Sequence, residues 1–202
     1  MKITKINYMK LLFTSSNKHK TTEIRNQLPD FEILNLIDVG CTEEIPETAS
    51  TFIGNARLKA RYGAENFGVN CFSDDSGLEV LALNNAPGVY SARYAGPERN
   101  DESNLQKLLA DLKDEENREA CFKTAIVLIL NGEEHIFEGV VEGSIINEKR
   151  GQNGFGYDPI FVPKGHSKTF AEMTLDEKSN LSHRARAVQK MVQFLYSTQK
   201  KS

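Results

Sequence analysis

The pair Asn131-Gly132 constrains the fold of this chain more than any other feature of its sequence. It separates an apolar, partly β-branched run at 122–130 from a second strand-like run at 134–146. Asn-Gly between two such runs is a strong signal for a tight β-hairpin, because both residues accept the positive φ that the turn requires. The second run is expected to bend near Gly139 or Gly143. The sequence therefore predicts an antiparallel pair of strands in the middle of the chain.

Shorter strands and amphipathic helices are predicted on both sides of this hairpin. Strands are expected at 10–14, 31–36 and 71–73, the last entering a turn at 74–77. Helices are expected at 17–28 and 51–65, with Thr51 as a candidate cap. Thr174 and Glu177 have the spacing of a capping box. Apolar residues at helical spacing mark two further helices, at Leu105, Leu108, Leu109 and Leu112, and at Ala185, Val188, Val192 and Leu195.

Together these elements predict a single α/β domain built on a mixed sheet. The 202 residues of the chain are enough for one sizeable core and few for two. We assign residues 10–200 to the domain and residues 1–9 to a polar N-terminal extension. Disorder of this extension and an alternative start at Met9 both remain open at this stage.

Composition excludes several classes of protein. A formal net charge of −3 with scattered Lys and Arg disfavours a nucleic acid partner, which usually requires a basic face. No apolar run approaches the ~20 residues of a membrane span, and the N-terminus lacks the pattern of a secretory signal. The three cysteines, Cys41, Cys71 and Cys121, form neither a zinc spacing nor an even set, so we expect core thiols in a reducing cytoplasm.

Adjacent carboxylates at Asp74 and Asp75 are the first candidates for chemistry. They follow a predicted strand and precede Gly77, and a turn there would aim both side chains near one site. Hard cations such as Mg²⁺ prefer one or two carboxylates, with water and substrate phosphates completing the coordination. Glu47, in the loop before a predicted helix, is a candidate for a further metal ligand. The alternative is an ordinary Asx turn and a solvated loop acid.

The loop between the first strand and the first helix is suited to an anion. Backbone N–H groups at a helix start favour negative charge, and the loop adds hydroxyls, an amide and two lysines. Its candidate phosphate-binding residues are Ser15, Ser16, Asn17, Lys18, His19 and Lys20. The loop lacks the glycines of a Walker A motif. Lys59 shares a helix face with Asn55 and is a candidate to reach a phosphate. A solvated helix cap with solvated lysines is the alternative.

A glycine-flanked aromatic, Phe155, is a candidate for stacking on a base. With no neighbouring side chain to crowd it, the ring can lie flat against a base, which contributes roughly 1–3 kcal/mol. The alternative is a hydrophobic plug under a loop. Downstream, Ser182 is a plausible N-cap that puts His183 and Arg184 in the first turn of the last helix. Cations there oppose the helix dipole, which hints at a bound acceptor.

Taken together in order, these segments resemble one known family. The motifs that carry the resemblance lie at 14–20, 51–56, 73–78, 86–94, 154–159, 178–179 and 182–184. They closely resemble the motifs of the inosine triphosphate pyrophosphatase family, also called XTP/dITP diphosphatases, from about Lys10 to near the C-terminus. In the first loop this chain has Ser15-Ser16-Asn17 where family members often have Thr-Gly-Asn, and His19 at a commonly glycine position.

The resemblance implies a two-lobed domain with a long mixed sheet flanked by helices, a central substrate cleft and a cytoplasmic homodimer. It implies Mg²⁺-dependent hydrolysis of non-standard purine nucleoside triphosphates, those of inosine, deoxyinosine and xanthosine, to the monophosphate and pyrophosphate. Asp75 resembles the catalytic base and a metal ligand, and Glu47 resembles the other metal-binding acid. The resemblance assigns substrate contacts to the residues of the first loop and to Ser76, Phe155, Gly156, Tyr157, Asp158, Lys178, His183 and Arg184.

Two other hypotheses remain open at the level of sequence. One is a distantly similar pyrophosphatase that acts on modified pyrimidine or methylated nucleotides. The other is a catalytically silent nucleotide-binding module, against which the presence of both Glu47 and Asp75 argues.

Overall fold

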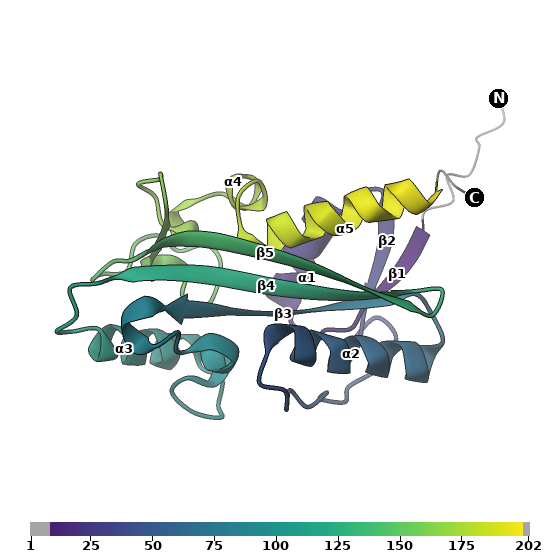
Figure 1. Ribbon diagram of the computed structural model, residues 1–202, viewed down its shortest axis with the longest axis horizontal. Helices are drawn as coiled ribbons and strands as arrows, with labels where there is room; N and C mark the ends of the chain where they lie inside the picture. Colours follow the sequence, from purple (N-terminus) through teal and green to yellow (C-terminus); the bar gives the residue numbers. More distant parts are fainter. Residues whose placement is uncertain (1–8, 200–202) are drawn as a thin grey trace.

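A computed structural model describes residues 9–199 of the chain. Its core is a six-stranded mixed sheet in the order β2-β1-β3-β4-β5-β6 (Figure 1). The strands are β1 (Met9–Phe13), β2 (Phe31–Asn35), β3 (Cys71–Val80), β4 (Glu119–Leu130), β5 (Glu133–Ile145) and β6 (Phe161–Pro163). β1 pairs with β2 and β3 in parallel, whereas the pairs from β3 to β6 are antiparallel. The predicted mixed α/β sheet is therefore confirmed.

Five α-helices surround this sheet in the described residues. They are α1 (Lys18–Gln27), α2 (Phe52–Phe67), α3 (Asp101–Asp111), α4 (Leu175–Ser179) and α5 (His183–Gln199). α2 and α5 lie on opposite faces of the long β3–β4–β5 sheet (Figure 1). Local chemistry explains where the helices begin: Thr51 caps α2 by accepting from the Gly54 N–H, and Thr174 forms the predicted capping box with Glu177.

The central hairpin follows the sequence prediction. Asn131 and Gly132 join β4 to β5 with φ values of 52° and 84°. β5 continues through Gly139 and Gly143 in register with β4, so neither glycine interrupts the strand. Gly139 serves another purpose, because a Cβ there would lie 2.0 Å from the His183 carbonyl oxygen of α5. The absence of a side chain at Gly139 therefore lets the start of α5 approach the sheet.

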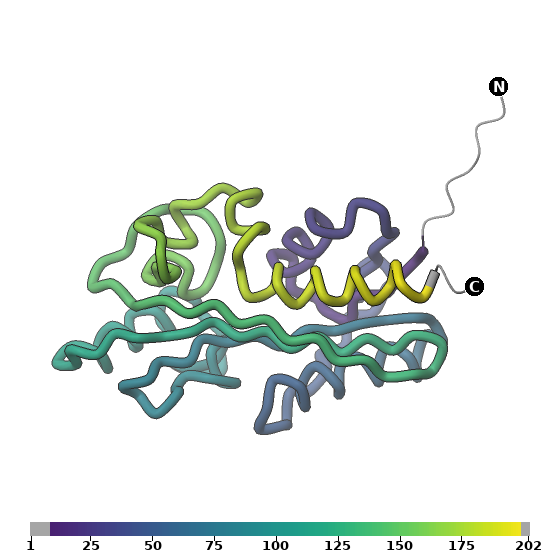
Figure 2. The backbone as a smooth tube through the Cα atoms, turned by 45° about the horizontal axis from the view of Figure 1, so that its top comes forward, coloured from purple at the N-terminus to yellow at the C-terminus, as the bar shows by residue number. Residues whose placement is uncertain are grey.

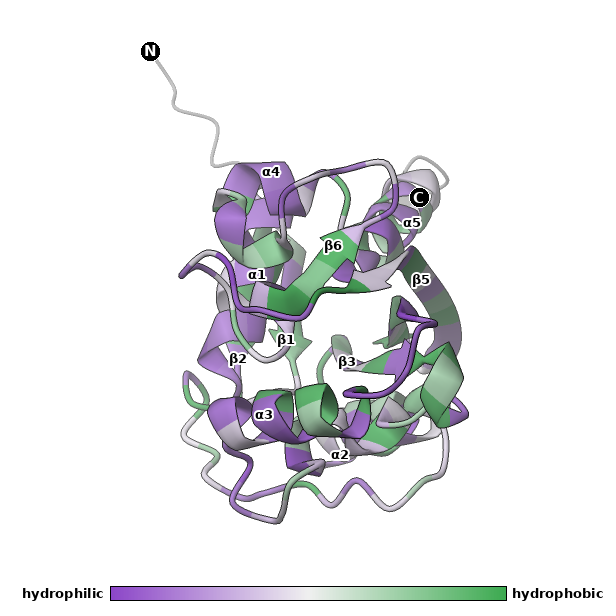
Figure 3. Ribbon diagram, turned by 90° about the vertical axis from the view of Figure 1, so that its left-hand side faces the viewer, coloured by the Kyte–Doolittle hydropathy of each residue, from purple (hydrophilic) through white to green (hydrophobic). Residues whose placement is uncertain are grey.

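Two large hydrophobic cores, with a third and smaller cluster between α2 and β4, give the molecule two lobes. One core gathers β1, β2, α1 and α5 around Phe13, Ile24 and Phe72, and the other gathers α3, β6 and the far half of the hairpin around Leu105 and Phe161. The β4–β5 hairpin runs the length of both lobes (Figure 2). β6 is hydrophobic along its length, whereas α4 is mostly hydrophilic (Figure 3).

The turn predicted at 74–77 is wrong. β3 is one continuous strand, and each residue from Cys71 to Val80 is opposite a residue of β4. Asp, Ser and Gly favour turns locally, but ten consecutive cross-strand pairings and packing against α2 outweigh that preference. Because successive side chains of a strand point to opposite faces, Asp74 and Asp75 face different sides of the sheet.

Three smaller expectations can be compared with the described part of the chain. Met9, predicted to end an extension at 1–9, is the first residue of β1, while residues 1–8 and 200–202 lie outside the described residues. Cys71 is a core thiol as expected, but Cys41 and Cys121 are only half-buried. Within residues 9–199, every helix is too short or too polar to span a bilayer.

Candidate active site

A pocket of about 250 Å³ opens where β1 leaves the sheet. β1 pairs with β3 only through Leu12 and Phe13, and the chain beyond them turns away into the loop before α1. Beyond this point β1 no longer covers the edge of β3, so side chains from both faces of β3 can line one pocket there. The predicted residues that line it are Ser15, Ser16, Asn17, Lys20, Glu47, Lys59, Asp75, Ser76, Phe155, Gly156, Tyr157, Asp158, Lys178, His183 and Arg184. Lys18 and His19 do not line it.

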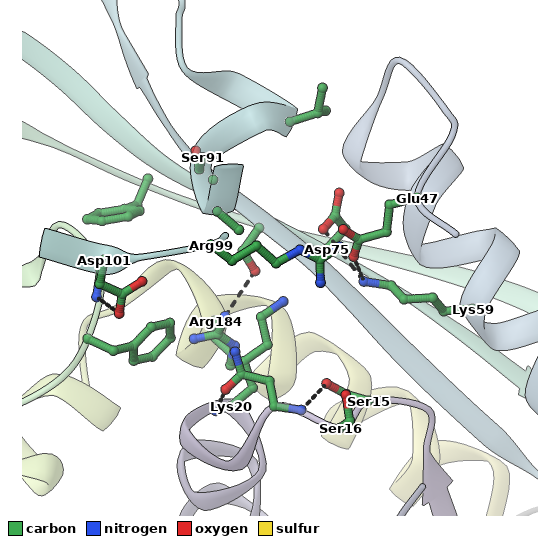
Figure 4. A pocket seen from close by; sticks show the side chains of 18 of the residues that line it. Ser15, Ser16, Lys20, Glu47, Lys59, Asp75, Ser91, Arg99, Asp101 and Arg184 are labelled. Carbon is green, nitrogen blue, oxygen red and sulfur yellow. Dashed lines mark hydrogen bonds and ion pairs between the residues drawn. The ribbon is translucent and has the colours of Figure 1, made fainter. Parts of the chain in front are cut away.

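Two carboxylates and a lysine meet on the α2 side of β3 (Figure 4). Lys59 Nζ lies 2.6 Å from Glu47 Oε1 and 3.6 Å from Asp75 Oδ1. Asn55, one helical turn before Lys59 on the buried face of α2, donates to Asp75 Oδ2 at 3.1 Å. Arg93 reaches Glu47 Oε2 at 3.4 Å. Lys59, expected to reach a phosphate, thus lies between the two predicted metal-binding acids.

Burial and the nearby lysines shift the pKa values of these two acids in opposite directions. Burial raises the pKa of Asp75 above its ordinary value, although Lys59 and Lys20 act in the opposite direction. Burial also opposes the charged form of Glu47, but Lys59 outweighs it and lowers the pKa of that carboxyl. Asp75 is therefore the better proton acceptor of the pair near neutral pH, which is the property a general base needs.

The two carboxylates beside Lys59 fit Mg²⁺ better than a metal that needs three or more protein ligands. Residues 9–199 contain no cluster of three or more His, Cys, Asp or Glu side chains that could hold a metal ion. Glu47 and Asp75 offer hard carboxylate oxygens, and both already contact the positive charge of Lys59. Mg²⁺ is commonly bound by one or two carboxylates, with water and substrate phosphates supplying the rest.

Asp74 points to the opposite face and is fully buried. Its carboxylate lies 3.0 Å from Lys20 Nζ and 2.9 Å from Arg184 Nε, and it accepts from the Ser76 hydroxyl. Burial favours the neutral acid here, but Lys20 and Arg184 outweigh it and hold the pKa of Asp74 well below its ordinary value. The expectation that both aspartates converge on one site is therefore wrong, since Asp74 anchors cations behind the pocket.

Glu23 of α1 completes this buried ionic network, and no local sequence pattern distinguishes it. Its carboxylate contacts Lys178 Nζ at 2.7 Å and accepts a hydrogen bond from Arg184 Nη1. Lys178 also contacts Asp158 at 2.6 Å. Burial opposes the charge on Glu23, but Arg184 and Lys178 outweigh it and lower its pKa. A lone glutamate in a helix resembles any solvated acid until the fold places it.

The start of α5 combines a cap with two pocket residues. Ser182 Oγ accepts from the Ala185 N–H at 3.2 Å, in agreement with the expected N-cap. The carboxylates of Asp74 and Glu23 offset the charge of Arg184 in the first turn. Burial, followed by Arg184 and Lys178, holds the pKa of His183 well below its ordinary value, so this imidazole is neutral. His183 stacks on Phe122 with centroids 4.7 Å apart, and its buried Nδ1 has no hydrogen-bond partner among the described residues.

The glycine-rich loop brings Phe155 into the lining of the pocket. The Phe155 ring stacks on His19 with centroids 5.3 Å apart and lies 5.1 Å from Lys178 Nζ. His19 therefore contacts the candidate base-binding ring instead of lining the pocket. Tyr157 is buried and donates its hydroxyl to the Ser91 carbonyl, so its side chain holds the loop in place. Asp158 accepts from the Phe155 N–H and Lys178.

The first loop forms a cap as well as a pocket wall. Asn17 accepts from the Lys20 N–H at 3.0 Å, and Ser15 Oγ accepts from the Asn17 N–H at 3.2 Å. Several pocket-lining residues were not expected from the sequence, including Glu43, Glu44, Arg99 and Asp101. Arg99 Nη2 lies 2.8 Å from Glu44 Oε1. Charged loop residues of this kind have no distinguishing local pattern.

Comparison with known proteins identifies the family of this chain. Residues 11–194 match the sequence profile of the Ham1 family. The chain belongs to the Ham1 family. One relative, the dITP/XTP pyrophosphatase of Flavobacterium psychrophilum, is 52% identical over 187 residues, which cover 92% of this chain and 98% of the relative. The resemblance noted from the sequence motifs is thereby confirmed.

Solved structures extend the Ham1 match to three dimensions. A HAM1 protein from Coxiella burnetii superposes with a TM-score of 0.85 at 40% identity, covering 94% of this chain and 99% of that one. The nucleoside-triphosphatase / dITP/XTP pyrophosphatase of Mycobacterium abscessus gives a TM-score of 0.72 at 47% identity, covering 91% and 98%. The two-lobed α/β architecture described above is thus the fold of Ham1 proteins.

Proposed function

We propose that this protein hydrolyses the triphosphates of inosine, deoxyinosine and xanthosine to the monophosphate and pyrophosphate, and so removes non-standard purines from the nucleotide pool. One observation carries the proposal. A buried carboxylate with a raised pKa, Asp75, lies beside Glu47 and Lys59 at one end of a pocket whose other end holds Phe155. The relatives named dITP/XTP pyrophosphatase support it.

Asp75 acts as the general base in this proposal. Asn55 holds one carboxylate oxygen of Asp75, which leaves the other, near Lys59, free to orient and deprotonate water. Glu47 and Asp75 are the residues that would hold Mg²⁺. When bound there, Mg²⁺ neutralises charge that develops on the phosphates. Lys20, Lys59 and the N–H groups of the first loop stabilise that charge electrostatically.

Base recognition is assigned to the opposite end of the pocket. A purine stacks on Phe155, and donors from Lys178, His183 and Arg184 face its C6 oxygen. Lys178 already donates to two carboxylates and Arg184 to Asp74, Glu23 and Ser76. Neither of these two side chains has an acceptor, so an amino group at C6 that faces Lys178 or Arg184 would find no partner on them. A buried unpaired polar group costs roughly 1–3 kcal/mol.

A panel of nucleoside triphosphates tests this function, with pyrophosphate and orthophosphate measured separately in the presence of Mg²⁺. Inosine and xanthosine triphosphates should release pyrophosphate in one step. Two mismatched contacts should lower kcat/KM for adenosine triphosphate by about 10²–10⁴-fold. Initial release of orthophosphate and a diphosphate would exclude the pyrophosphatase assignment.

The family resemblance also motivates the proposals that the protein is a cytoplasmic homodimer and that its contacts follow the residue assignments above. Analytical ultracentrifugation at micromolar concentration tests the dimer directly, because a monomer would give a molecular mass of 22.7 kDa. Loss of turnover in excess EDTA tests the requirement for Mg²⁺.

A further inference from the structure

Most cations that line the pocket are already neutralised by buried or partly buried acids. In residues 9–199, Lys20 pairs with Asp74, Lys59 with Glu47, Lys178 with Asp158 and Arg184 with Glu23. Removing one partner from such a pair leaves the other charge buried without compensation, which is strongly unfavourable. These cations can add a contact to a substrate phosphate, but they cannot move to it.

Arg99 is different because its partner is exposed. Its guanidinium contacts Glu44 at 2.8 Å, and the two side chains are 45% and 72% exposed. Exposed ion pairs contribute little to stability. The Arg99 guanidinium can therefore leave Glu44 for another anion without leaving a buried charge behind.

The position of Arg99 directs it to the acid end of the pocket. Its side chain extends across the pocket toward Glu47 and Asp75 (Figure 4), and its charge acts on the carboxyl of Glu47. Arg99 belongs to the segment just before α3, whereas Glu44 and Glu47 belong to the loop before α2. The Arg99 backbone has a φ of 51°, which is uncommon for a residue with a side chain.

We propose that Arg99 binds the outer phosphates of the substrate, and that its guanidinium exchanges Glu44 for the β- and γ-phosphates when the nucleotide enters. This inference rests on the proposed function and adds a phosphate contact from the α3 lobe to those of the first loop. Arginine suits the role because its planar fork matches two phosphate oxygens. Glu44 then acts as a competitor, since it occupies the guanidinium in the free protein.

The test compares Arg99→Ala, Arg99→Lys and Glu44→Gln with the unchanged protein. Readouts are KM and kcat for inosine triphosphate, and calorimetric affinities for inorganic pyrophosphate and inosine monophosphate. Arg99→Ala should raise KM and weaken pyrophosphate binding by about 10-fold or more, the scale of a charge-assisted hydrogen bond. Affinity for the monophosphate should change less than about two-fold, because the β- and γ-phosphates are absent from it.

The two other variants and a control separate phosphate binding from a structural effect. Arg99→Lys should recover part of the pyrophosphate affinity, and Glu44→Gln should strengthen it. Lys164→Ala, which removes an exposed cation paired with Glu142 outside the pocket, is the matched control and should change neither affinity.

Unchanged pyrophosphate affinity in Arg99→Ala overturns the proposal. Equal weakening of pyrophosphate and monophosphate binding also overturns it, because that result indicates a general distortion of the pocket. Failure of the unchanged protein to release pyrophosphate from any triphosphate would instead reject the proposed function, so the two failures are distinct.

Discussion

Asp74 and Asp75 are neighbours in the chain with opposite electrostatic surroundings. Two cations hold Asp74 ionised, whereas burial raises the proton affinity of Asp75. Environments that push the pKa values of two carboxyls apart commonly divide their roles. Under the proposed function, this division assigns proton transfer to Asp75, while Asp74 positions Lys20 and Arg184.

Replacement of each aspartate by asparagine separates these roles. Asp75→Asn should lower kcat by at least about 10²-fold, the low end for a general base, with little change in stability because Lys59 keeps Glu47 as a partner. Asp74→Asn should instead lower the free energy of unfolding by about 3–5 kcal/mol, because it leaves two buried cations undercompensated. Turnover assays and urea denaturation measure the two effects. Normal turnover in Asp75→Asn would require a different base.

Glu23 should make the protein sensitive to acid. Its folded-state pKa lies below the ordinary value of 4.5, so the unfolded chain binds the proton more tightly. The stabilisation is therefore complete above about pH 4.5 and is lost as the pH falls through the lower folded-state pKa. Glu23→Gln should be less stable at pH 7 and lose less stability between pH 5 and 3. Urea denaturation across this range measures both slopes, and parallel slopes would contradict the assignment.

At the scale of elements, α5 depends on the missing side chain of Gly139. A methyl group there would meet the His183 carbonyl at 2.0 Å and the Ala187 nitrogen at 2.7 Å, both backbone atoms that cannot move independently. Gly139→Ala should cost about 1–3 kcal/mol, as overpacking typically does, and should lower turnover by shifting His183. Glu138→Ala, an exposed neighbour, is the control. Equal stabilities of the two variants in urea would show that α5 accommodates the added methyl group without a loss in the free energy of unfolding.

The predictable elements were those fixed by local chemistry. Asn131-Gly132, the Thr51 cap and the Thr174 capping box all rest on contacts within four residues, and the structure has them. The strand at Asp74 was missed because its cause is pairing with β4, about fifty residues away. Arg99 and Glu23 were missed for the same reason, since only the fold brings Arg99 to the pocket and Glu23 to the cations that line it. The motif residues were found as a set through the family resemblance.

At the scale of the whole molecule, the metal is expected to serve catalysis and not folding. Both lobes have their own apolar core, and the two acids proposed as metal ligands are already compensated by Lys59. Excess EDTA should therefore abolish turnover while it shifts the thermal unfolding midpoint by less than about 2 °C, below the effect of 1 kcal/mol for a protein of this size. A large fall in the midpoint would reveal a structural metal.

The alternation of side chains along β3 has a consequence for how such a chain can change in evolution. A strand that slips by one residue exchanges its two faces. One inserted or deleted residue between Cys71 and Asp74 would carry the carboxylate now beside Lys59 to the side of Arg184, and the other carboxylate in the reverse direction. Substitutions can accumulate along this segment one at a time, but a change of its length would exchange the faces of both carboxylates in a single step.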